Sequence, residues 1–182
     1  MSNRARNVIL LSLTVFGIVL AVLGFIALRG GVEDTSTAKP QPGTPIARAL
    51  AAAKPASKPF QGLNYARLGV GGRCLRVVVA DQDSERVQGL RGLFDLGGYD
   101  GMLFVYGQDS NARFTMSGTP LALDIVWYDA NGRPVSNTTM QPCMDGTDST
   151  CPIYASQSAY RYALETQAGH GGGASTLGAC PA

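Results

Sequence analysis

The sequence predicts an all-β domain, a mainly antiparallel β-sandwich or barrel with one or two short helices, preceded by an N-terminal transmembrane helix. Between Gly101 and Tyr128, three runs rich in β-branched and aromatic residues follow each other closely, separated by short clusters of turn-forming residues. Hairpins that follow one another without intervening helices are typical of sandwiches and barrels. An uncharged run of 21 residues, from Val8 to Leu28, precedes this region and predicts the transmembrane helix.

The uncharged run is long enough to cross a lipid bilayer, since 21 helical residues span roughly 31 Å. A cleavable signal peptide is the alternative, but its apolar region is usually shorter and ends in small residues. We therefore predict a cytoplasmic tail at residues 1–7, a transmembrane anchor at 8–28, a Pro/Ala-rich linker at 29–60 and an extracytoplasmic β-domain at 61–182. The balance of Lys and Arg on the two sides of the anchor is nearly even, so it does not decide the orientation.

Within the domain, hydrophobic alternation and turn residues define the elements. One helix is expected over residues 81–92, with Val87 and Leu90 on the face that packs on the sheet. Residues 101–106 are apolar on both alternating faces, which predicts a central strand. Strands are predicted at residues 65–68, 74–80, 101–106, 112–116, 121–128, 133–140 and 160–165.

Four cysteines, an even number, in a chain with an apolar N-terminal run indicate an oxidising compartment. Three pairings are possible. We favour Cys143–Cys151, which would close a loop of polar residues, together with Cys74–Cys180, which would tie the first confident strand to the C-terminal tail. The alternative is four free thiols in a cytosolic domain. With the disulfide pairing, the domain lies outside the cytoplasm and the chain is a single-pass protein of the cell membrane.

The net charge of +2 comes from the N-terminal third of the chain. Residues 1–60 carry seven Lys or Arg and two acidic residues, whereas residues 61–182 carry eight Arg and eleven acidic residues. A mildly acidic domain is a poor binder of phosphate backbones. We therefore expect no nucleic-acid partner.

Short motifs follow one another along the domain. They are Gly89-Leu90, Gly101-Met102-Leu103-Phe104, Phe114-Thr115-Met116-Ser117-Gly118-Thr119, Leu123-Asp124-Ile125, Cys151-Pro152-Ile153-Tyr154 and Leu164-Glu165-Thr166-Gln167-Ala168-Gly169. In this order, over about residues 74–178, they resemble the prokaryotic family named domain of unknown function 192. The resemblance implies a compact, mostly antiparallel β-fold and no particular reaction. Thr115, Gly118 and Ala122 stand where the family pattern has Trp, Asn and Pro.

Phe114, Met116, Thr119 and Asp124 flank one predicted turn and could rim a binding pocket. The alternative is that they form a corner of the core. Methionines together with cysteines also suggest a soft-metal site, but Met is more often a gap filler in a core. We expect no cofactor and no metal.

Asp124 interrupts an apolar strand, where an unpaired charge is costly. Its structural interpretation is a carboxylate bonded to backbone N–H groups or to an arginine such as Arg86 or Arg113. Its functional interpretation is a pocket acid that acts alone or with Glu165. His170, the only histidine, lies in a glycine-rich segment and lacks the support that a catalytic base needs.

The sequence therefore favours a membrane-tethered, non-catalytic binding module for an envelope component or a protein partner, anchored in the lipid bilayer through Val8 to Leu28. A carboxylate-dependent envelope hydrolase that uses Asp124 and Glu165 is one alternative. A soft-metal-binding protein is another.

Overall fold

A computed structural model describes residues 43–145 and 147–181. The predicted tail, the predicted anchor from Val8 to Leu28 and residues 29–42 of the predicted linker lie outside the described residues. Within the described part, no helix is long and apolar enough to cross a membrane.

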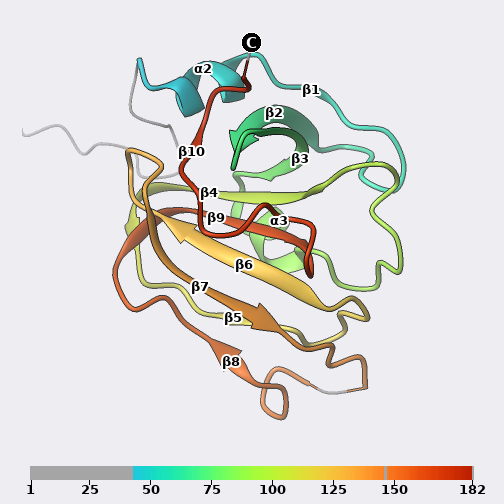
Figure 1. Cartoon of the computed structure of the whole chain (residues 1–182). Helices are drawn as coiled ribbons and strands as arrows, with labels where there is room; N and C mark the ends of the chain where they lie inside the picture. The colour runs from blue at the N-terminus through green and yellow to red at the C-terminus, as the bar shows by residue number, and fades with distance from the viewer. Residues whose placement is uncertain (1–42, 146, 182) are drawn as a thin grey trace, which may run out of the picture. The chain divides into compact units, whose positions relative to one another are not determined.

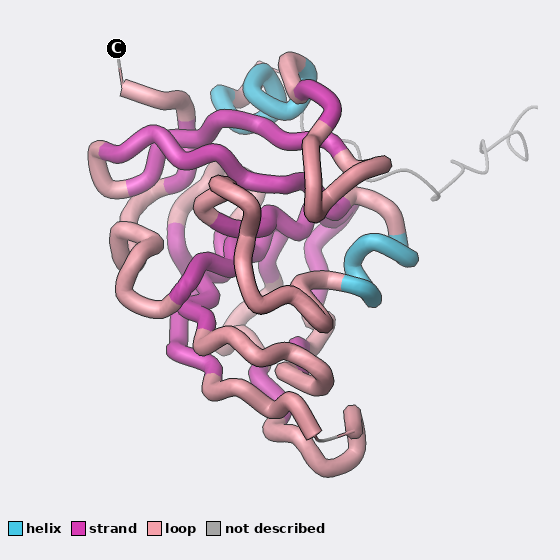
Figure 2. Tube along the Cα trace, turned by 90° about the vertical axis from the view of Figure 1, so that its right-hand side faces the viewer, coloured by secondary structure: helices cyan, strands magenta, loops and turns pink. Residues whose placement is uncertain are grey.

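Two short helices and ten strands make up the described part of the chain, and Figure 2 shows the helices well apart, with strands between them. The helices are α2 (Pro45–Ala51) and α3 (Asp83–Gln88). The strands are β1 (Lys54–Pro55), β2 (Asn64–Val70), β3 (Arg73–Ala80), β4 (Gly101–Ser110), β5 (Phe114–Thr115), β6 (Leu123–Tyr128), β7 (Pro134–Met140), β8 (Ile153–Tyr154), β9 (Tyr160–Gln167) and β10 (Leu177–Gly178).

Eight of these strands form one mixed sheet in the order β1-β2-β3-β4-β9-β6-β7, with β10 paired to β2. The prediction of a mostly β fold with two short helices is confirmed. The expectation of consecutive hairpins is wrong at two places: β9 separates β4 from β6, and β3 and β4 are parallel and are connected through α3. Parallel neighbours need such a crossover. β9 lies between β4 and β6 and is antiparallel to both, and β5 pairs with β8 in a separate small sheet.

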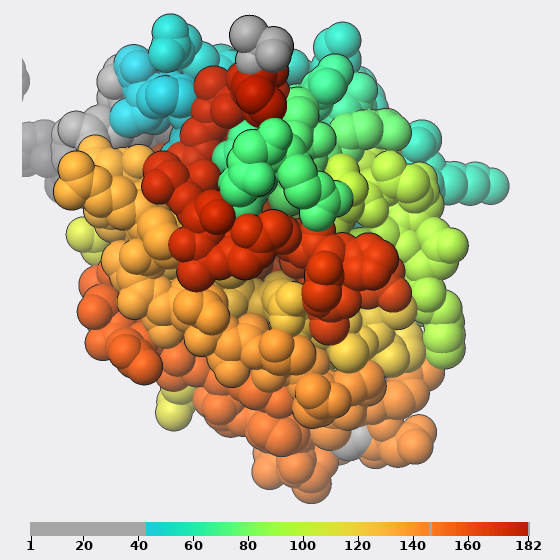
Figure 3. All heavy atoms as spheres, in the orientation of Figure 1, coloured from blue at the N-terminus to red at the C-terminus, as the bar shows by residue number. Residues whose placement is uncertain are grey.

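The C-terminal segment joins the two sides of the strongly curled sheet (Figure 1). Leu177 of β10 pairs with Val70 of β2, and its N–H donates to the carbonyl of Gly132 in the β6–β7 turn at 2.8 Å. Figure 3 shows the C-terminal residues crossing one face of the domain between β2 and the β6–β7 hairpin. Gly132 has a φ of +77°, and a Cβ there would lie 2.2 Å from the carbonyl oxygen of Leu177, so the contact requires glycine.

The two faces of the sheet support two cores. On the inner face of the curl, Leu103 and Val105 of β4 pack with apolar side chains of β2, β3, β6 and β9 and with Ile46 of α2. On the outer face, Met102 and Phe104 pack in a second core that is covered by loops and the β5–β8 segment. As the alternation predicted, β4 is a central strand that is buried on both faces.

Residues 43–60 belong to the domain, which corrects the predicted boundary at residue 61. Ile46 and Phe60 are 1% and 4% exposed, and β1 pairs with β2. The Thr44 hydroxyl caps α2 by accepting from the N–H of Ala47 at 3.1 Å. The composition does not indicate that this segment is folded, because α2 buries only one of its residues. A low apolar content is otherwise typical of a linker.

The structure contains the two predicted disulfides, Cys74–Cys180 and Cys143–Cys151. The first ties β3 to the chain that follows β10. The second closes the loop before β8.

We expect the two disulfides to contribute unequally to stability. Replacing Cys74 and Cys180 with serine opens a loop of 106 residues and should lower the free energy of unfolding by about 4–5 kcal/mol. Replacing Cys143 and Cys151 opens a loop of eight residues and should cost about 2.5 kcal/mol. Urea unfolding followed by the fluorescence of Trp127, the only tryptophan, measures both values. A larger loss for the short loop would contradict this expectation.

Candidate functional site

A cavity of about 400 Å³ lies between α3 and the outer face of the sheet. This volume is in the range of small-molecule binding sites. The cavity brings together four of the five predicted site residues, Phe114, Met116, Thr119 and Glu165. The fifth, Asp124, does not line it.

Arg86, rather than buried apolar side chains, holds α3 over the cavity. No residue of α3 is buried. The guanidinium of Arg86 donates to the carbonyl of Val105 at 2.7 Å, lies 5.1 Å from the centre of the Tyr106 ring and pairs with the carboxylate of Asp83. The prediction that Val87 packs on the sheet is wrong, because its side chain is 73% exposed at the cavity rim.

Glu165 is the one carboxylate residue that is buried in the described part of the chain, with 5% of its surface exposed. It lies on β9 opposite Met102 of β4 and Ile125 of β6, on the apolar outer face. Its carboxyl has no hydrogen-bond partner within residues 43–145 and 147–181, and burial raises its pKa to about 8. The group is therefore mostly neutral at pH 7 and presents an O–H donor to the cavity.

Asp124 is bonded into the scaffold on the opposite face of the sheet. Its two oxygens accept from the hydroxyl of Thr139 and the N–H of Gly169, each at 2.7 Å. Asp124 pairs with Thr166, the neighbour of Glu165 along β9. Since side chains alternate along a strand, Asp124 and Glu165 project from opposite faces. This arrangement fits the structural interpretation of Asp124, with a backbone N–H and a threonine hydroxyl in place of the suggested arginines.

The predicted apolar residues Phe114 and Met116 form one wall of the cavity. The Phe114 ring makes edge contacts with Phe104 and Trp127 at centroid distances of 5.1 and 5.9 Å. Met116 is 1% exposed, and its carbonyl accepts from the N–H of Thr119 at 2.8 Å. This turn holds Thr119 beside the apolar wall, where its side chain is buried.

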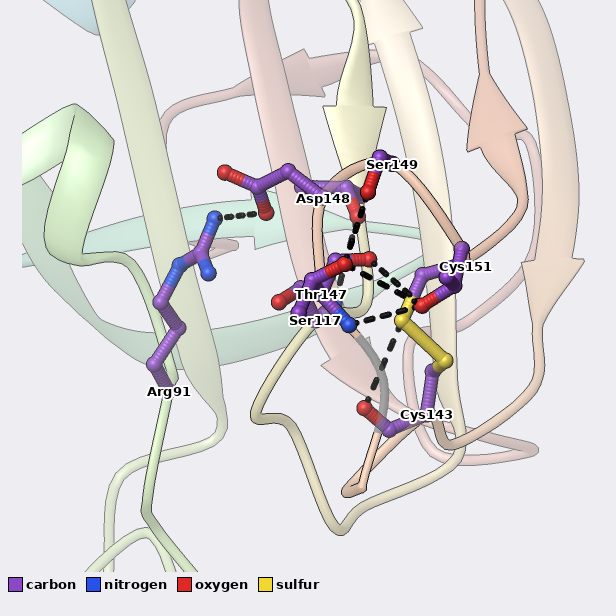
Figure 4. A network of polar contacts seen from close by, with 9 residues as sticks. Arg91, Ser117, Cys143, Thr147, Asp148, Ser149 and Cys151 are labelled. Carbon is purple, nitrogen blue, oxygen red and sulfur yellow. Dashed lines mark hydrogen bonds and ion pairs between the residues drawn. A yellow bond between two sulfur atoms is a disulfide. The ribbon is translucent and has the colours of Figure 1, made fainter.

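The loop closed by Cys143–Cys151 supplies a charged group to the rim (Figure 4). Asp148 of this loop accepts from the guanidinium of Arg91 at 2.9 Å, and this hydrogen bond lowers the pKa of Asp148 below its ordinary value. Arg113, also on the lining, has no ion-pair partner within the described ranges. The rim therefore carries two ion pairs and one unpaired cation.

The sequence profile of the DUF192 family, described as uncharacterized ACR, matches residues 66–173. The chain belongs to this family. The resemblance that the motifs indicated is thereby confirmed. A comparison with curated proteins finds no significant match to this DUF192 chain.

Two solved structures resemble this DUF192 chain. One is a protein of unknown function from Novosphingobium aromaticivorans, with 26% identity and a TM-score of 0.53, over 66% of this chain and 86% of that chain. The other is a putative transcription regulator from Sinorhizobium meliloti, with 26% identity and a TM-score of 0.46, over 57% of this chain and 79% of that chain.

Sequence reasoning missed the polar residues that surround the cavity of this DUF192 domain. The sequence suggests Arg86 only as a partner of Asp124, and it assigns no site role to Arg91, Tyr106 or Asp148. The spacing of Asp83 and Arg86 at i and i+3 on a predicted helix signals their ion pair. No local signal places Asp148 beside Arg91, because 57 residues separate them.

A second cavity, of about 320 Å³, lies beside Asp95, Asp100 and His170. The Asp100 carboxylate accepts from the N–H of Arg76 at 2.7 Å, and Asp95 accepts from the N–H of Gly97. His170 is exposed in its glycine-rich segment. Across residues 43–145 and 147–181, no three His, Cys, Asp or Glu side chains are grouped to hold a metal, and all four cysteines are in disulfides.

Burial of Glu165 makes the stability of this DUF192 domain depend on pH in a defined direction. Between the ordinary pKa of 4.5 and the folded-state pKa of about 8, the unfolded chain has released the proton that the folded chain keeps. The contribution of Glu165 to the free energy of unfolding is therefore fully present below pH 4.5 and decreases as the pH rises to about 8. Over this window the difference between the two pKa values corresponds to about 5 kcal/mol, so we expect Glu165→Gln to gain up to that amount relative to the wild type.

Urea unfolding of both proteins at a series of pH values measures this difference. Asp145→Asn, which removes an exposed carboxyl, is the matched control and should follow the wild type. A difference between Glu165→Gln and the wild type that does not change with pH would contradict the assignment.

Proposed function

We propose that this chain is a membrane-tethered, extracytoplasmic binding module whose cavity under α3 takes a small molecule of the cell envelope without transforming it. The observation that carries the proposal is Glu165. A buried carboxyl without a hydrogen-bond partner lowers stability. It becomes satisfied when a ligand in the cavity supplies the missing partner.

The geometry favours binding over hydrolysis. Hydrolysis by paired carboxylates needs two acids that flank one bond. Asp124 and Glu165 lie on opposite faces of the sheet, and Asp124 is fixed by Thr139 and Gly169. His170 does not line the cavity. Glu165 thus faces the cavity with neither a second predicted acid nor a histidine base beside it.

Two disulfides and the uncharged run from Val8 to Leu28 support the proposed location outside the cytoplasm. Disulfides persist in oxidising compartments. A run of this length can anchor the domain in the bilayer. The proposed partners are therefore the lipid bilayer, through this run, and an envelope component in the cavity.

The cavity can be tested by filling it. Thr115 lines the cavity at a position where the family pattern has Trp, so Thr115→Trp reduces the volume with a residue that the fold accommodates elsewhere in the family. Full-length protein incubated with an envelope extract should retain small molecules that mass spectrometry detects after denaturation. Thr115→Trp should lose them, and Ala174→Trp, at an exposed residue away from the cavity, should retain them. Identical captured molecules in all three proteins, or their turnover by the wild type, would contradict the proposal.

The location is tested on intact cells. Protease added from outside should remove the domain, and a membrane-permeant maleimide should leave all four cysteines unlabelled until a reductant is added. These outcomes follow because the domain is placed outside and its sulfurs are paired. A protected domain with four reactive thiols would place it in the cytoplasm.

A further inference from the structure

We infer that the ligand of this cavity is a small monocarboxylate with an apolar tail, whose carboxylate accepts a hydrogen bond from the Glu165 side chain. This inference rests on the proposed function and specifies the ligand class of the same site. It follows from three properties of the lining: its apolar walls, its charge balance and the donor at its base.

The apolar tail is indicated by the walls. Phe114, Met116 and Leu123 face the cavity, and Val87 adds an aliphatic side chain that is 73% exposed at the rim. A ligand that covers exposed apolar surface beside a cavity removes this surface from water, which favours binding. With a volume of about 400 Å³, the cavity is large enough for a chain or ring of several carbons.

The charge balance of the rim favours an anion. The ionisable and charged groups around Glu165 come from α3 and the turn after it, from β4, from the segment before β5 and from the disulfide loop. They are Asp83, Arg86, Arg91, Tyr106, Arg113 and Asp148. Two arginines are neutralised, by Asp83 and by Asp148, and Tyr106 is neutral because burial raises its pKa. Arg113 therefore leaves the lining with one positive charge while Glu165 is protonated, and this charge attracts anions.

The O–H donor of Glu165 at the base of the cavity favours a carboxylate over an amine. A protonated carboxyl donates one short, charge-assisted hydrogen bond to a carboxylate, so that two carboxyl groups share one proton. An ammonium ligand would instead need Glu165 ionised. It would also face the Arg86 guanidinium, which already lies over the Tyr106 ring at 5.1 Å. The same cavity therefore disfavours a cation.

The test uses four probes that share a chain and differ in the head group: hexanoate, hexanamide, hexanol and hexylammonium. Calorimetric titration of the full-length protein should show that hexanoate binds most tightly. Its affinity should be constant between about pH 6 and about pH 8, where the probe is ionised and Glu165 keeps its proton. Above about pH 8 the affinity should fall about tenfold per pH unit, as the Glu165 proton is lost. Glu165→Gln keeps a donor that does not titrate, so it should bind hexanoate with no such decline. Glu165→Ala should lose at least about tenfold in affinity, since the charge-assisted bond is gone.

The outcomes separate the ligand class from the binding function. Tightest binding of hexylammonium, lost in Glu165→Gln, would overturn the monocarboxylate and leave a binding cavity. Tightest binding of hexanamide or hexanol would do the same. If neither the wild type nor Thr115→Trp binds any of the four probes, the proposal of a monocarboxylate ligand is overturned. The capture of molecules from an envelope extract tests the binding function separately. Circular dichroism of each variant excludes unfolding as the cause of a loss.

Discussion

The pairing of β9 with both β4 and β6 fixes the arrangement on which the cavity depends. Its register places Glu165 opposite Met102 and Ile125, on the face that α3 and β5 cover. A slip of one residue would turn Glu165 toward the inner core and bring Thr166 to the cavity, because side chains alternate along a strand. Gly101 allows the close approach of the two strands, since a Cβ at that position would lie 2.0 Å from the Glu165 carbonyl oxygen. The site is thus a product of strand register.

A stable scaffold surrounds a cavity that opposes stability. The inner core, the outer core and two disulfides stabilise the fold, whereas Glu165 is desolvated without a partner and α3 buries none of its side chains. Groups whose pKa is perturbed by burial in a cleft concentrate at functional sites. Arg86 attaches α3 through polar contacts and the Tyr106 ring, which leaves the space beneath the helix open. The two cores and the disulfides therefore offset the loss of stability that the cavity and the buried carboxyl of Glu165 cause.

Hydrophobic alternation and turn residues predicted most strands in their order, because these signals are local. The insertion of β9 between β4 and β6 and the parallel pairing of β3 with β4 depend on partners far apart in sequence. The same limit applies to the site. Asp124 and Glu165 both interrupt apolar runs, and only the register reveals that Glu165 faces the cavity. The Pro- and Ala-rich composition of residues 43–60 predicts a linker, and it does not reveal that Ile46 and Phe60 are buried in the domain.

The position of β9 also affects how the chain is made. Synthesis proceeds from the N-terminus, so β4 and β6 emerge before Tyr160–Gln167 exists to lie between them. Until then both strands present open edges, the state from which sheets aggregate. β10 and Cys180, the partner of Cys74, are made later than β9. The domain therefore stays incomplete until these later elements have been made, and a stop codon between β9 and β10 would leave Cys74 without its disulfide partner.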